Sequence, residues 1–172
     1  CGSNPGMVGE LDRYGDLKTL DVHIEALQQL LDALKPSAVT DLDISGIGIG
    51  ATGAGHVADY VRDAKASIAT LTLDSNGVFG ELYPSGDVKE ADKFVTEVQP
   101  ILDALKTSSI TSLSLRGTGM GVKGVIAVSD AMSAMASIKV INLSKCPLTG
   151  ATMNRGRWEN IDSDMTGFIA LC

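Results

Sequence analysis

Few residues in this sequence could perform chemistry, and each has a simpler structural interpretation. The two histidines, His23 and His56, have no Cys or Asp constellation in register with them, so their types and spacing do not indicate a metal or catalytic site. Asp41 and Asp43 are two residues apart in a segment expected to be a strand, so they share a face, as an acid–base pair could. Nothing nearby would bury either carboxylate, and we therefore interpret them as part of a solvated or partner-binding face.

Two further segments resemble chemical motifs. The Gly-x-Gly-x-Gly pattern at 46–50 looks like a phosphate loop, but its glycines alternate with isoleucines and let the chain turn tightly out of a strand. Cys146 is predicted to be a small buried thiol. A reactive thiol needs a basic neighbour, and the adjacent Lys145 should point to the opposite face. We therefore predict no enzyme activity, no cofactor and no metal.

Composition excludes several classes of function. The 172 residues carry a net charge of −7 with a pI near 4.7, which argues against nucleic acid as a partner, because phosphate binding needs a basic surface. No apolar run approaches the roughly 20 residues that span a bilayer, so no membrane insertion is expected. The three cysteines show no Cys-x-x-Cys spacing, and such a sparse, odd number suits a reducing compartment. We expect an intracellular, cytoplasmic protein.

The elements that would position these residues come from an internal duplication. At an offset of 71, residues 15–50 align with residues 86–121 without a gap, and 16 of the 36 positions are identical. Inside this period, four segments fit the spacing L-x-x-L-x-L-x-x-(N/C)-x-L. They predict strands near 39–45, 68–74, 110–116 and 138–144, because apolar residues alternate with a period of two in each. Helical patterns follow each strand.

Some segments are assigned through the duplication rather than through their own pattern. Leu17–Val22 reads like a strand when taken alone, but it aligns with 88–94 in a helical run, so we predict helix. Trp158 aligns with the start of the same helix, which favours core packing over the alternative of an anchor at a subunit contact. The same two interpretations stay open for Phe79 and Tyr83, which belong to an inserted loop.

The strand consensus and the G-A-x-x-V-A-x-x-V pattern at 53–61 resemble the leucine-rich repeats of ribonuclease-inhibitor-like proteins. The resemblance implies an α/β fold, a leucine-rich-repeat solenoid with parallel strands on the concave face and helices on the convex face, over residues 1–172. Residues 1–4 align with the end of a strand and 156–172 with the start of a helix, so neither end resembles a cap. We expect a fragment of a longer array, or a larger assembly that covers the uncapped ends.

The architecture implied by this resemblance favours binding of a protein partner through the concave strand face. Outward positions on the early strands are acidic and those on the late strands are basic, which suits a dipolar protein. The alternative is a structural scaffold subunit within a larger multi-protein assembly, and a third hypothesis, an enzyme or enzyme activator, has only Arg116 as a candidate. The candidate partner-binding residues are Asp41, Asp43, Thr72, Asp74, Ser114, Arg116, Lys139, Asn142 and Lys145.

Overall fold

The computed structural model describes residues 2–154 and 157–171, so the predictions made for Cys1, Gly156 and Cys172 lie outside it. Its central element is a four-stranded parallel sheet with the strand order β3-β4-β7-β8. The strands are paired in register, with Leu42, Leu71, Leu113 and Ile141 as successive neighbours. Their bounds are β3 (Asp41–Asp43), β4 (Thr70–Thr72), β7 (Ser112–Ser114) and β8 (Val140–Asn142). All four lie within the segments that the apolar alternation predicts.

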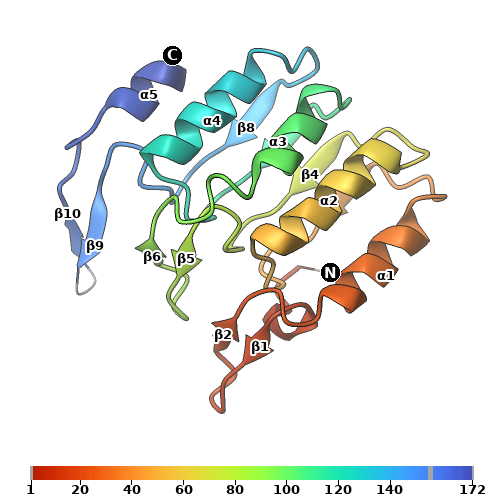
Figure 1. The fold of residues 1–172 in the computed structure, drawn as a ribbon, viewed down its shortest axis with the longest axis horizontal. Coiled ribbons are helices and arrows are strands. Elements are labelled where there is room, and N and C mark those ends of the chain that lie inside the picture. Colours follow the sequence, from red (N-terminus) through yellow and green to blue (C-terminus); the bar gives the residue numbers. More distant parts are fainter. Residues whose placement is uncertain (1, 155–156, 172) are drawn as a thin grey trace.

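Helices form a row on one side of this sheet (Figure 1). They are α1 (Ile24–Leu34), α2 (Ala51–Asp63), α3 (Gln99–Lys106), α4 (Val122–Met132) and α5 (Thr166–Leu171), preceded by a short 3-10 helix at Pro5–Met7. Between sheet and helices lies an aliphatic core, to which each strand contributes its alternate side chains, such as Leu42 and Ile44 or Leu113 and Leu115. Among the described residues, no helix combines the length and the apolar character that crossing a bilayer requires.

Three β-hairpins complete the described part of the chain. Each consists of two short antiparallel strands that form a small sheet of their own, apart from the parallel sheet. In Figure 1 they lie at one edge of the molecule, beside the first residues of α2 and α4. The pairs are β1 (Glu10–Leu11) with β2 (Leu17–Thr19), β5 (Glu81–Leu82) with β6 (Val88–Glu90), and β9 (Thr152–Asn154) with β10 (Arg157–Glu159).

The prediction of a leucine-rich-repeat solenoid is wrong. Of the ten strands in the described residues, four form the parallel sheet, whereas six belong to separate antiparallel hairpins that alternate with the helices along the sequence. The molecule is a small mixed α/β domain and not one uniform ladder of strands. The duplication explains why elements recur along the chain, but it does not determine how they assemble, and the inserted segments fold as hairpins instead of lengthened loops.

The structure also bears on four local predictions, of which the first two are wrong. Leu17–Val22 contains strand β2, and the aligned segment contains strand β6, so neither begins as a helix. Trp158 lies in strand β10 with 43% of its surface exposed, so it does not pack in the core. Phe79 is buried, whereas Tyr83 is exposed in the turn of the second hairpin. The partly buried Cys146 lies with its thiol 3.4 Å from the carbonyl oxygen of Leu115, as a small packed side chain would.

A carboxylate of the protein itself binds at the end of the Gly-x-Gly-x-Gly segment at 46–50. Helix α2 begins after Gly50 without a capping side chain of its own. Instead, Asp21 from the turn after β2 accepts hydrogen bonds from the backbone N–H groups of Gly50, Thr52 and Gly53 at 2.8, 2.9 and 3.1 Å. A carboxylate satisfies unpaired N–H groups at a helix N-terminus and interacts favourably with the helix dipole. The anion at this loop is therefore Asp21.

Asp92 repeats the arrangement one duplication later. Its carboxylate accepts from the N–H groups of Gly121, Lys123 and Gly124 at 2.7, 2.8 and 2.9 Å, at the start of α4. The start of the β5–β6 hairpin lies close to the loop that precedes α4. This explains the glycine at 119, because a Cβ there would lie 2.7 Å from the Cα of Gly80. Each aspartate thus fixes a hairpin to the helix that lies beside it.

Replacement of Asp92 by alanine should lower the free energy of unfolding by about 2 kcal/mol, the upper end for loss of a helix cap, because three N–H groups lose their acceptor. Urea unfolding followed by circular dichroism measures the change. Asp130→Ala is the matched control, since this exposed residue of α4 forms no side-chain hydrogen bond within the described residues, and its cost should stay under about 0.5 kcal/mol. Equal losses for the two variants would show that Asp92 does not stabilise α4.

Candidate protein-binding face

The candidate residues of the four strands lie on the face of the parallel sheet that the helices leave uncovered. Asp41 and Asp43 are exposed on either side of the buried Leu42, as the period of two predicts. Thr72 and Ser114 occupy the equivalent outward position on β4 and β7, and the register places them side by side. We call this surface the sheet face, and it consists of Asp41, Asp43, Thr72, Asp74, Ser114, Arg116 and Asn142. Lys139 and Lys145 are exposed beyond the two ends of β8, out of alternation with Asn142, and Lys145 borders a groove together with Asp87 and Trp158.

A chain of hydrogen bonds fixes the centre of the sheet face. The Ser114 hydroxyl donates to Asp74 Oδ1, which also accepts from the backbone N–H of Arg116 at 3.0 Å. Asn142 Nδ2 donates in turn to the Ser114 Oγ at 3.0 Å. The chain crosses β4, β7 and β8, so these side chains are held in place before any partner arrives. Preorganisation of this kind lowers the entropy cost of binding.

Two carboxylates form the acidic edge of the sheet face. The Thr40 hydroxyl donates to Asp41 at 2.7 Å, and the hydroxyls of Thr40 and Thr70 lower the pKa of Asp41 below its ordinary value. The hydroxyl and N–H of Ser45 lower the pKa of Asp43 in the same way. Both groups are therefore charged at neutral pH. A general acid near neutral pH needs a raised pKa, so this pair is suited to electrostatic binding and not to proton donation.

Three cations lie near the other edge of the parallel sheet, around β7 and β8. Arg116 follows β7, while Lys139 and Lys145 flank β8, and none of them is ion-paired in the part of the chain that the structure describes. Because the strands are ordered β3-β4-β7-β8 in space, the acidic-to-basic order read along the sequence becomes a separation of charge across the surface. Among the described residues, no group of His, Cys, Asp or Glu side chains could hold a metal ion.

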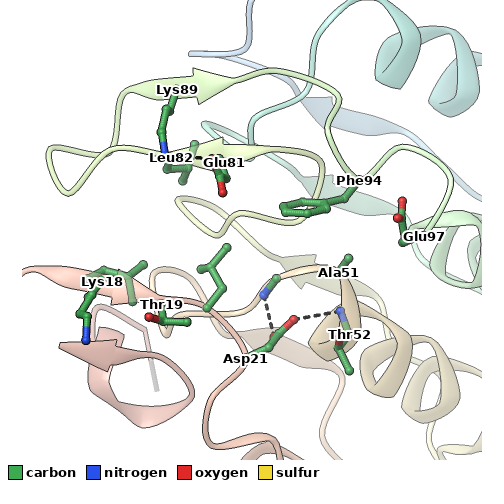
Figure 2. A pocket seen from close by; sticks show the side chains of 13 residues that line it. Lys18, Thr19, Asp21, Ala51, Thr52, Glu81, Leu82, Lys89, Phe94 and Glu97 are labelled. Carbon is green, nitrogen blue, oxygen red and sulfur yellow. Dashed lines mark hydrogen bonds and ion pairs between the residues drawn. The ribbon is translucent and has the colours of Figure 1, made fainter.

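Sequence reasoning missed a second feature, a cleft between the first two hairpins. Figure 2 shows it bordered by the β1–β2 hairpin on one side and by the β5–β6 hairpin on the other, with the start of α2 between them. Its volume is about 500 Å³, which lies within the range of small-ligand sites. The repeated pairs Lys18–Glu10 and Lys89–Glu81, at the offset of 71, were the available signal for matched hairpins.

Comparison of the sequence with known protein families and curated proteins finds no match. The resemblance to ribonuclease-inhibitor-like repeats therefore stays a prediction from the sequence.

Proposed function

We propose that this protein binds another protein through the sheet face. The observation that carries the proposal is the separation of charge across the parallel sheet, with Asp41 and Asp43 on the edge strand β3 and Arg116, Lys139 and Lys145 beside β7 and β8. Complementary potentials orient a partner during encounter and exclude wrong partners. The expected partner has a surface with the opposite order of charge. The proposal places this interaction in the cytoplasm, in keeping with the sparse cysteines.

Charge reversal tests this proposal once a partner has been isolated by crosslinking and purified. Asp41→Lys with Asp43→Lys should slow association about tenfold or more at low salt, and should reduce the dependence of the association rate on salt, because long-range attraction is screened by ions. Stopped-flow or biosensor kinetics at several salt concentrations measure both quantities.

The matched control is the double variant Glu25→Lys and Asp130→Lys. It makes the same change in net charge, but both residues lie exposed on helices, away from the sheet face. Its association rate should stay close to that of the unchanged protein after correction for net charge. A control variant that slows association as much as the sheet-face variant would mean that the partner contacts the helices.

A second candidate function, a structural subunit of a larger assembly, has one observation in its favour. Trp158, Ile161, Phe168 and Ile169 are exposed at the end of the molecule formed by β10 and α5, where an open groove of about 440 Å³ has mostly apolar walls. Exposed apolar surface of this extent marks interaction sites in many proteins. A stable complex of fixed stoichiometry would favour the scaffold, whereas exchange of partners would favour the sheet face as a recognition surface.

A further inference from the structure

The cleft between the first two hairpins lies at the edge where the parallel strands end and α2 begins, so it is separate from the sheet face. In open α/β sheets this edge is the usual position of ligand sites. The residues that line the cleft are Leu17, Lys18, Thr19, Leu20, Asp21, Gly50, Ala51, Thr52, Glu81, Leu82, Lys89, Phe94 and Glu97.

One wall of the cleft is the edge of a strand. The three residues of β2, Leu17–Thr19, border it, followed by Leu20 and Asp21 of the next turn. Successive side chains of a strand point to opposite faces, so a cavity that touches all three residues of β2 lies along the backbone edge. Strand β2 is paired only with β1 within the described residues, and its other edge is open to the cleft. An open strand edge presents N–H and C=O groups that an extended peptide can pair with.

The lysines around the cleft are all ion-paired. Lys18 pairs with Glu10 at 3.3 Å, and Glu81 pairs with Lys89 at 3.1 Å and with Lys93 at 2.8 Å. The ammonium groups of Lys93 and Lys89 lower the pKa of Glu81, which is therefore charged at neutral pH.

Two carboxylates of the cleft lie outside these lysine pairs. Asp21 already accepts hydrogen bonds from the backbone N–H groups at the start of α2. Glu97 forms no hydrogen bond or ion pair with any residue that the structure describes, so the unbalanced charge is negative.

The aromatic ring of Phe94 lines the cleft together with Glu97. In Figure 2 the ring of Phe94 points into the space between the hairpins, and Glu97, which lines the same cleft, lies on the other side of the point where the ring joins the backbone. The ammonium of Lys93 already lies 5.8 Å from the ring centroid. A guanidinium group stacks on aromatic rings and also pairs with carboxylates through its planar N–H groups. The apolar side chains of Leu20 and Leu82 would contact the aliphatic stem of such a side chain.

From these observations we propose that the cleft binds an extended, arginine-containing peptide segment of a partner protein. The peptide backbone pairs with the open edge of β2, and the arginine side chain lies against Phe94 with its guanidinium beside Glu97. The site is independent of the sheet face, because none of the residues involved belongs to that surface.

Titration of the isotope-labelled full chain with a blocked pentapeptide, Thr-Val-Arg-Val-Thr, tests the proposal by nuclear magnetic resonance. Amide signals of residues 17–21 should shift on binding. The same peptide with citrulline in place of arginine should bind about three- to tenfold more weakly, because it keeps the shape and loses the charge. Blocked arginine alone should bind more weakly than the pentapeptide, since it cannot pair along a strand.

Variants of the protein complete the test. Glu97→Gln should weaken binding of the arginine peptide about three- to fivefold, as expected for a largely exposed ion pair, and should leave binding of the citrulline peptide unchanged. Phe94→Leu keeps an apolar side chain and should also weaken the arginine peptide. The control Glu25→Gln removes an exposed acid of α1 and should have no effect.

Three results would overturn the proposal. They are equal affinity for the arginine and citrulline peptides, equal affinity for blocked arginine and the pentapeptide, and amide shifts confined to the sheet face. Unchanged thermal unfolding of the Glu97→Gln variant separates a loss of binding from a loss of fold. Since the Asp41 and Asp43 variants leave the cleft intact, failure here and failure of the sheet-face proposal are distinguishable.

Discussion

Replacement of Asn76 by alanine is expected to lower the free energy of unfolding by about 3–5 kcal/mol, among the largest effects of any single substitution in this protein. The Asn76 side chain is fully buried. Its Oδ1 accepts from the N–H groups of Ile47 and Ile49, each at 3.1 Å, and its Nδ2 donates to the carbonyls of Ile44 and Leu73 at 2.8 and 3.0 Å. Alanine would leave four backbone groups without these partners, and each unpaired buried group is costly. Chemical denaturation measures the loss.

Thr118→Val is the matched control for Asn76. Thr118 is equally buried at the corresponding position after β7, but its hydroxyl makes one close hydrogen bond, at 2.9 Å to the carbonyl of Leu115. Valine has a similar shape, so the expected cost is about 1 kcal/mol. If the Asn76 variant cost no more than the Thr118 variant, the buried amide would not be joining β3 and β4.

Leu113→Ala should lower the free energy of unfolding by about 2–5 kcal/mol, the range for large-to-small substitutions in a close-packed core. Leu113 is 1% exposed at the centre of β7, between Leu71 on β4 and Ile141 on β8. The surrounding strands and helices limit how far the cavity can collapse. Equilibrium unfolding in urea, monitored by circular dichroism, provides the value.

Ser114→Ala, one residue further along β7, is the comparison. Its hydroxyl joins Asp74 and Asn142 on the partly exposed sheet face, where water can replace the lost hydrogen bonds. The expected cost is below about 1 kcal/mol. A larger loss for Ser114 than for Leu113 would reverse the assignment of the two faces of the sheet.

The parallel strands could be predicted because each has a long apolar alternation around it. Leu42 and Ile44, or Leu71 and Leu73, indicate both the strand and its buried side, and this also identified the outward residues of the sheet face. Their hydrogen bonds could not be foreseen. The contact between Asp74 and Ser114 joins residues 40 positions apart and depends on which strands are neighbours.

The hairpins could not be predicted in the same way. Strands such as Glu10–Leu11 are too short to show a period, and they are stabilised by contacts with distant segments. Leu17–Val22 looks like a strand when taken alone, and its first three residues do form strand β2. Its alignment with a segment assumed to be helical led to the wrong prediction of a helix. Trp158 was misplaced for the same reason, and the cleft, which exists only between two hairpins, had no local signal.

The aspartates at 21 and 92 also bear on how the protein opens locally. Each carboxylate binds backbone amides of a segment about 30 residues further along the chain, so the segment that follows a hairpin and the first turn of a helix share three hydrogen bonds. A hairpin cannot swing away without exposing those amides, and the helix end cannot fray without releasing the hairpin. Each hairpin and its helix end therefore form one cooperative unit with a common free energy of opening.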